Sequence, residues 1–327
     1  MQRRVLIYSG RAEPEATARA LALATAVLRR GGGQATCLLA ARGVAPVEDP
    51  PDGLTVVELP ALAPGEGRPG GAQAARAGLR LLTDLTLTFM PDVVVVDRDP
   101  LGALGELAIA LAALSAMEPP PRTWLALDDL DLIRLGRRPQ ALRALRRTAG
   151  RYGALLVFGE ADGCQPFVAT VLDAGRVPFV AYAGYGRFSA RPAPAWAAHE
   201  IEGRRVVVAP PELGPDATVR RQELDEAVGE AALVVTTPDH PALEMALAHG
   251  RALLLLTGAA AGPTEPPTEH QLRARALERR GRAHVLAADR LGLAALRRMT
   301  AVAAAVPPLP EPPSTADRAA GLLLNAV

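Results

Sequence analysis

An acidic side chain, Glu244, interrupts the otherwise apolar helix that the sequence predicts over residues 241–249. This helix follows a buried strand-like run, ALVVTT (232–237), and a turn that contains Asp239 and His240. A carboxylate can accept hydrogen bonds from both hydroxyls of a vicinal diol. Because ligands of open parallel sheets bind outside the carboxyl ends of the strands, this position favours a ligand contact. The alternative interpretation is that Glu244 is a solvated helix acid.

The turn before Glu244 has two interpretations of its own. Asp239 and His240 precede Pro241, which favours the first position of a helix, so a capping role suits both residues. The hydroxyl group of Thr237 could donate a hydrogen bond to a phosphate, and His240 follows three residues later. Thr237 and His240 are therefore candidate ligand contacts together with Glu244.

The helix predicted over residues 269–281 also begins with polar side chains. Thr268 and Gln271 have the spacing of a capping box, in which both side chains satisfy N–H groups of the first turn. Because a helix amino terminus also attracts anions, Glu269 and Gln271 are candidate ligand contacts too. The sequence leaves both roles open.

A polar loop, SGRAEPEATAR, follows the first strand-like run of the chain. Gly10 and Arg11 are expected to organise this loop. Glu13 or Glu15 could accept a proton from a hydroxyl group if its pKa were raised, as a general base requires. The same two acids also fit the first turn of a helix that begins near Pro14, where the helix dipole favours negative charge.

Further acids follow the next buried strands. Asp97 closes the run DVVVVD (92–97) and is expected to organise the loop by accepting backbone N–H groups. Asp128, Asp129 and Asp131 form a denser group that raises the question of a metal. Magnesium needs one or two carboxylates plus a phosphate, but such groups also serve as helix caps and exposed turns. We predict no metal site.

The composition excludes several kinds of chemistry. The chain has 327 residues, and its 36 basic residues are all arginine. A Schiff base, a pyridoxal phosphate site and a Walker A lysine require the missing amine. A net charge of +1 provides no overall field for nucleic acid. Cys37 and Cys164 cannot form a metal cluster alone and are interpreted as buried thiols.

The chain has the features of a cytoplasmic protein. A strand-like segment, RRVLIYS, begins at once, so we predict no signal peptide. No apolar stretch approaches the ~20 uncharged residues that span a bilayer. Peripheral contact with a membrane stays open.

Short apolar runs alternate with helical patterns, which predicts α/β architecture with doubly wound parallel sheets. The Pro-containing segment 185–204 interrupts the alternation and suggests a linker. We predict an N-terminal domain over 1–184, a C-terminal domain over 205–306, and a Pro-rich break with a terminal helix over 307–327. The predicted strands are 5–9, 35–41, 54–60, 92–97, 123–129, 153–159, 178–184, 205–210, 232–237, 252–258 and 283–287.

Three stretches in this order resemble the predicted glycosyltransferases related to the peptidoglycan N-acetylglucosaminyltransferase. They are PDVVVVDRDPLGALGEL (91–107), GALLVFGEAD (153–162) with VPFVAYAGYGR (177–187), and the segment from LVVTTPDHPALEMALAHGRALLLL to the end of RARALERRGRAHVL (233–286). The opening strand, loop and helix are similar too. The resemblance implies the GT-B fold, in which two Rossmann-like domains face each other across a cleft. The second domain is short by about one strand–helix unit.

The resemblance also implies site residues. The position matching the family's ribose-binding acid is Glu244, and Glu269 with Gln271 match a pair that contacts the donor sugar, with His270 inserted between them. The family needs no metal or cofactor, because the nucleotide-sugar is a substrate. The sequence departs from the family in two glycine-rich loops, which contain Pro210, Pro211 and Pro238 here. The first domain also contains no histidine to act as a base.

Three functional hypotheses remain. The first is a metal-independent, hexosyltransferase-type glycosyltransferase that uses a nucleotide-sugar and an unknown acceptor. In it, Glu13 or Glu15 replaces the missing histidine, and Thr237, His240, Glu244, Glu269 and Gln271 bind the donor. The second is a catalytically degenerate GT-B scaffold that acts as a binding or assembly partner. A nucleotide-sugar epimerase on the same architecture is a weaker third.

Overall fold

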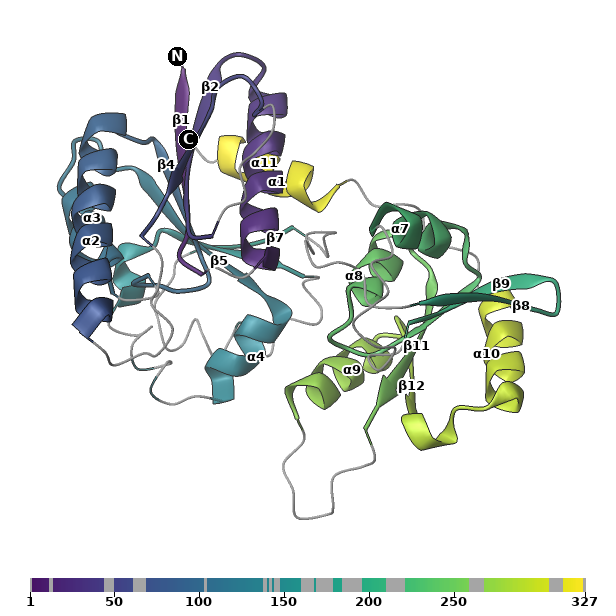
Figure 1. Ribbon diagram of the computed structural model, residues 1–327. Coiled ribbons are helices and arrows are strands. Elements are labelled where there is room, and N and C mark those ends of the chain that lie inside the picture. The colour runs from purple at the N-terminus through teal and green to yellow at the C-terminus, as the bar shows by residue number, and fades with distance from the viewer. Residues whose placement is uncertain are drawn as a thin grey trace.

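Two α/β domains lie side by side, and the chain returns to the first domain at its carboxyl end (Figure 1). The computed structural model describes residues 2–11, 14–43, 50–60, 69–102, 105–137, 140, 143, 148–159, 168, 179–183, 196–209, 221–258, 268–305 and 314–325.

The first domain is built on a seven-stranded sheet in the order β3-β2-β1-β4-β5-β6-β7. Every pair of neighbouring strands in it is parallel. The order reverses between β1 and β4, and the crevice at such a reversal is where open α/β sheets bind ligands. The strands are β1 (Arg3–Ser9), β2 (Ala35–Ala41), β3 (Leu54–Glu58), β4 (Val93–Asp97), β5 (Arg122–Asp128), β6 (Ala154–Phe158) and β7 (Val180–Tyr182).

Helices cover both faces of this sheet. Four consecutive valines make β4 buried along its whole length, as a strand covered on both faces requires. On one face α1 (Pro14–Gly31) packs with α11 (Thr315–Asn325). On the other face lie α2 (Pro69–Phe89) and α3 (Leu107–Ser115), and α4 (Asp129–Arg137) follows β5 directly. A 3-10 turn, Ala149–Arg151, precedes β6.

The second domain has a five-stranded sheet in the order β12-β11-β10-β9-β8. Its strands are β8 (Ala197–Ile201), β9 (Arg204–Ala209), β10 (Leu233–Thr236), β11 (Ala252–Thr257) and β12 (His284–Ala287). The edge strand β8 is antiparallel to β9, and the other neighbours are parallel. One face packs against α7 (Arg221–Glu230), α8 (Pro241–Ala248) and α9 (Glu269–Arg279), and the other against α10 (Leu293–Ala305). A 3-10 turn, Ala288–Arg290, separates β12 from α10.

These features confirm the predicted α/β architecture of two Rossmann-like domains, the second built on the smaller sheet. Every predicted strand is present, with ends that lie within two residues of the predicted ones. One local interpretation was wrong, because residues 197–201 of the predicted linker form β8 and pair with β9. Cys37 is buried and free, which confirms the interpretation as a buried thiol, whereas Cys164 lies outside the described residues. None of the described helices is both long and apolar enough to cross a membrane.

Candidate functional site

The carboxyl ends of β4 and β5 carry a buried group of charges in the first domain. Arg19, from α1, has only 5% of its surface exposed and forms an ion pair with Asp97. The same guanidinium lies 3.1 Å from Asp128 at the end of β5. Asp97 therefore pairs with an arginine side chain, and its Oδ2 atom has no hydrogen-bond partner among the described residues.

Arg98 enters this group from an unusual backbone conformation. Its φ is 66°, in the left-handed region that side chains other than glycine seldom occupy. Its Nη2 atom lies 2.9 Å from Asp128 and its Nε atom 3.1 Å from Asp131. Such a conformation is strained and persists only where surrounding contacts hold it. Residues of this kind occur most often at functional sites.

The three acids after β5 correct part of the sequence-based interpretation. Asp128 accepts a hydrogen bond from the backbone N–H of Asp131 at 2.7 Å, so its capping role is confirmed. Asp129 and Asp131, however, are 5% and 7% exposed, so an exposed turn was the wrong interpretation. Burial opposes charge here, but Arg98 and Arg19 outweigh it and hold the pKa of Asp128 below its usual range. Burial and the charge of Asp128 raise the pKa of Asp131 to about 7.

The loop after β1 lies at the same edge of the first sheet. A side chain at Gly10 would meet the ring and hydroxyl of Tyr8 at 2.2–2.9 Å, so only glycine fits there. Arg11 forms an ion pair with Asp99 at 2.7 Å, which ties this loop to the one after β4. Beneath them, the Tyr8 hydroxyl donates to Glu106 at 2.5 Å. Gly10 and Arg11 thus lie in the loop that they are predicted to organise, and that role stays a prediction.

The loop after β10 provides polar groups from the second domain. His240 is the N-cap of α8, and its Nδ1 atom accepts a hydrogen bond from the N–H of Ala242 at 3.0 Å. A neutral ring that accepts at Nδ1 carries its proton on Nε2. Nε2 is buried without a hydrogen-bond partner in the described parts of the chain, as is Oγ1 of Thr237. Burial lowers the pKa of His240 to about 4, which keeps the ring neutral.

Arg273 joins the two domains and also approaches Glu244. Arg273, on α9, donates from Nε to Asp129 of the first domain at 2.9 Å and from Nη1 to the carbonyl oxygen of Pro238 at 2.7 Å. Its Nη2 atom lies 3.7 Å from Glu244, whose side chain is 32% exposed. Burial raises the pKa of Glu244 to about 7, although Arg273 opposes this effect. Glu244 is therefore a partly buried acid at the domain interface, which excludes the interpretation as a fully solvated helix acid.

The start of α9 has the predicted capping box. The N–H of Gln271 donates to Thr268 at 3.2 Å, and the N–H of Thr268 donates to the Gln271 side chain at 2.9 Å. Glu269 instead accepts from Arg134 of α4 at 2.9 Å. This ion pair is a second bridge between the domains, since α4 belongs to the first and α9 to the second. A role in donor binding for either residue remains untested.

The predicted site residues thus divide into three groups. Asp97, Thr237, His240 and Glu244 lie at the carboxyl ends of the two sheets, and Gln271 and Glu269 lie at the start of α9 beside the first domain. Glu13 lies outside the described residues, as do Pro210 and Pro211, and the side chain of Glu15 is also not described.

Sequence reasoning missed the arginines that hold this site together. Arg19 pairs with acids 78 and 109 residues away, and Arg273 with an acid 144 residues away, so no local pattern reveals them. The available signal for Arg19 was its place inside the apolar pattern ATARALALATAV of α1, because a charge there must find a partner.

The described part of the chain contains no group of three or more His, Cys, Asp or Glu side chains that could hold a metal ion. Arginine guanidiniums occupy the space between the acids after β4 and β5.

Comparisons with known proteins identify the fold through structure. No protein-family model matches the sequence, and no curated protein does. Among solved structures, similar folds include the glycosyltransferase SnogD from Streptomyces nogalater, with a TM-score of 0.56 and 15% identity over 99% of this chain and 100% of that chain. The spinosyn forosaminyltransferase SpnP has a TM-score of 0.53 and 16% identity over 99% and 94%. The glycotransferase of kitacinnamycin has a TM-score of 0.53 and 13% identity over 99% and 95%.

These neighbours show the class of fold. Each match covers nearly the whole of both chains, so the two domains and their arrangement are shared, and the fold is GT-B. Identities of 13–16% carry the fold alone.

Proposed function

We propose that the protein transfers a sugar from a nucleotide-sugar donor to an acceptor hydroxyl without a metal ion. The observation that carries this proposal is the convergence of two strand-end edges. Asp97 and Asp128 lie at the carboxyl ends of the first sheet, and Arg273 links Asp129 beside them to Glu244 and Pro238 at the carboxyl end of the second. Parallel α/β sheets bind ligands at these edges, and two facing edges suit two substrates.

The second domain would hold the donor. The Nε2–H of His240 and the hydroxyl of Thr237 are buried groups that lack a partner among the described residues, and both precede the amino terminus of α8. Such a terminus favours a phosphate, and the unused donors would then hydrogen-bond its oxygens. Glu244, one turn further along α8, would accept the hydroxyls of the ribose. Glu269 and Gln271 would contact the sugar.

The reaction in this proposal is a displacement at the anomeric carbon with inversion. Glu13 or Glu15 takes the proton from the acceptor hydroxyl, and that oxygen forms a bond to the anomeric carbon. The bond between this carbon and the diphosphate oxygen breaks, and the diphosphate leaves with the electron pair. The amino terminus of α8 and the guanidinium of Arg273 would stabilise its negative charge.

One observation favours the alternative, a GT-B scaffold that binds a partner and has lost catalysis. Arg273 is 3% exposed, and its guanidinium already donates hydrogen bonds to Asp129 and Pro238. The group that would bind a diphosphate is therefore occupied by acceptors from the chain itself. A donor must then exchange places with these contacts, or the domains must separate.

A thermal-shift screen separates the two functions. The protein is heated with uridine, thymidine, guanosine and cytidine diphosphates and with their sugars, with and without EDTA. A ligand at a hundred times its Kd adds about 2.7 kcal/mol to the free energy of unfolding. We expect at least one nucleotide to raise Tm in EDTA, and Glu244→Gln to remove this shift.

The control is Glu223→Gln, because Glu223 is an exposed acid on α7. Its nucleotide shift should equal that of the unchanged protein. No shift with any of these ligands at millimolar concentration would refute the transferase proposal and leave the binding scaffold.

A further inference from the structure

A cavity of about 350 Å³ lies at the opposite edge of the second sheet from the candidate donor site. Its lining includes the first residues of β10, β11 and β12, whereas Thr237 and His240 follow the other end of β10. The four residues of β10 separate the two edges by roughly 10 Å at ~3.3 Å per residue. The cavity is therefore distinct from the proposed donor site.

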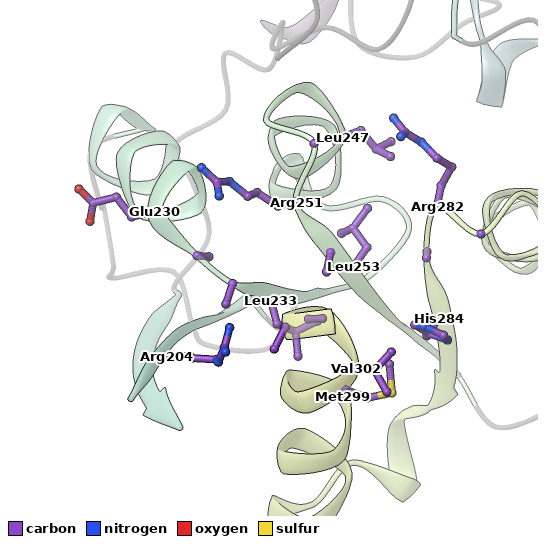
Figure 2. A pocket seen from close by; sticks show the side chains of 18 residues that line it. Arg204, Glu230, Leu233, Leu247, Arg251, Leu253, Arg282, His284, Met299 and Val302 are labelled. Atoms are coloured by element: carbon purple, nitrogen blue, oxygen red, sulfur yellow. The ribbon is translucent and has the colours of Figure 1, made fainter. Parts of the chain in front are cut away.

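The interior of this cavity is apolar. Leu233 and Leu253 contribute from the strands, Leu247 from α8, and Met299 and Val302 from α10 (Figure 2). Several alanines complete the lining. A volume of about 350 Å³ falls in the range of small-molecule pockets, which are mostly apolar with a few polar groups that fix orientation.

Basic side chains surround these apolar residues. Figure 2 shows Arg204, Arg251, Arg282 and His284 around Leu233 and Leu253. The only carboxylate in the lining that the structure describes is that of Glu230, which forms an ion pair with Arg205. The cavity is thus apolar inside and positively charged at its boundary.

Two of these arginines have no ion pair of their own in the described structure. Arg204 and Arg251 form neither a salt bridge nor a side-chain hydrogen bond with another described residue, and the Nε atom of Arg251 is buried. A buried guanidinium N–H without an acceptor is costly, so a ligand that supplies an acceptor is favoured.

The helix ends at this edge do not account for the arginines. α7, α8 and α9 all end here, and exposed carbonyl groups at a helix carboxyl terminus attract cations. Backbone N–H groups already donate to one or more of these carbonyls at the end of each helix, however. The N–H of Ala231 donates to Val228, that of Arg251 to Ala246, and that of Arg282 to Leu277, at 2.8–3.2 Å. The guanidiniums of Arg204 and Arg251, which form no side-chain contact with another described residue, are available to a ligand.

We propose that this cavity binds a small amphipathic anion, with an apolar body and one carboxylate or phosphate head group. The body would lie against Met299, Val302 and Ala303 of α10, where burial of apolar surface is favourable. The head group would accept charge-assisted hydrogen bonds from Arg251 and Arg204. A neutral apolar molecule would leave the buried Nε–H of Arg251 unsatisfied, and a cationic one would add charge repulsion.

Isothermal titration calorimetry tests this proposal with four probes that share one alkyl chain, each below its micelle concentration. They are decanoate, decyl phosphate, decanol and decyltrimethylammonium. We expect one or both anions to bind at least about ten-fold more tightly than decanol, because hydrogen bonds between charged groups are stronger than those to a neutral hydroxyl. The cation should not bind. The stronger of the two anions identifies the head group.

Two variants and a control locate the binding. Ala303→Phe fills the cavity from α10 and should abolish binding, and Arg251→Gln should weaken it about ten-fold. Arg275→Gln removes an exposed arginine of α9 that does not line the cavity and should change nothing. All variants should keep the Tm shift with nucleotides, so failure here is distinguishable from failure of the transferase proposal.

Three results would overturn the proposal. One is no binding of either anion at millimolar concentration. Another is binding of decanol as tight as that of decanoate, which would make the site purely apolar. The last is unchanged anion binding in folded Ala303→Phe and Arg251→Gln proteins, which would place the ligand elsewhere.

Discussion

At the scale of single residues, the buried charges between the domains stand out. Among the described residues, three arginines, Arg19, Arg98 and Arg273, pair with a group of five acids: Asp97, Asp128, Asp129, Asp131 and Glu244. Removing charges from water is expensive, and mutual attraction repays that cost only with good geometry. Burial raises the pKa of Asp131 and of Glu244 to about 7, so both can take up a proton near neutral pH.

The raised pKa of Asp131 predicts a pH-dependent stability. Its pKa is about 7 in the folded protein and ~3.9 in an unfolded chain. The folded state therefore binds the extra proton, and the stability it gives is complete below pH ~4 and is lost as the pH rises through about 7. We expect Asp131→Asn, which cannot ionise, to gain roughly 1–3 kcal/mol relative to the unchanged protein between pH 5 and 8.

Urea unfolding at several pH values measures this difference. Asp84→Asn is the control, because Asp84 is an exposed acid of α2. Its stability should run parallel to that of the unchanged protein across the whole pH range. A parallel curve for Asp131→Asn as well would show that Asp131 is already ionised at pH 5.

Sequence patterns identified the acids of this site as candidates, but they did not predict which acids are buried or which arginines they pair with. Glu244 and Asp97 were recognised because each follows an apolar run at a strand end or on a helix. The burial of Asp129 and Asp131 was not predicted, because it depends on Arg273 and Arg19 from distant segments. An acidic residue is predicted to be exposed when its sequence neighbours offer no partner, and only the fold brings a distant arginine beside it.

At the scale of elements, the buried strands were the most predictable parts. Runs such as VVVV in β4 and ALLLL in β11 are too short for helices and too apolar for loops. The helix α2 was not predicted, because it begins with Pro-Gly-Gly and its exposed positions include Leu87. The strand β8 was missed because its burial is low, so it lacks a continuous apolar run.

The capping box of α9 allows a prediction for one element. Thr268→Ala removes the side chain that accepts from the N–H of Gln271. Loss of such a cap costs about 1 kcal/mol, and α9 also carries the interdomain residues Glu269 and Arg273. We expect urea denaturation to show a loss of about 1 kcal/mol in the free energy of unfolding.

Thr88→Ala serves as the matched control, since Thr88 is an exposed threonine of α2. Alanine has the higher helix propensity, so that change should leave stability equal or slightly higher. If Thr268→Ala behaved like Thr88→Ala, the capping box would not stabilise α9.

At the scale of the whole molecule, two kinds of contact hold the domains together. The last helix, α11, packs its buried residues Ala319, Ala320 and Leu323 against the first domain (Figure 1). Across the interface, α4 of the first domain meets α9 of the second. The ion pairs Asp129–Arg273 and Arg134–Glu269 lie at this contact, the first buried and the second partly exposed.

A double-mutant cycle on Asp129 and Arg273 measures how strongly the domains are coupled. Arg273→Met leaves the carboxylate of Asp129 buried without its partner, which costs about 3–5 kcal/mol when a buried pair is broken. Asp129→Asn removes the charge that Arg273 faces, so the double variant should lose about 1–3 kcal/mol less than the sum of the single losses. Arg4→Gln provides the control, because the Arg4–Asp92 pair is 38% and 31% exposed, and should cost under ~1 kcal/mol.

Calorimetry of the same variants shows whether this pair makes the domains unfold together. We expect a single transition in the unchanged protein and two in Arg273→Met, because each domain has a hydrophobic core of its own and loses a contact with the other. The Tm of the second domain should fall more than that of the first, because its sheet has five strands and that of the first domain has seven. An additive cycle with one transition in every variant would mean that Asp129 and Arg273 do not couple the domains, and that the α1–α11 contact alone accounts for their joint unfolding.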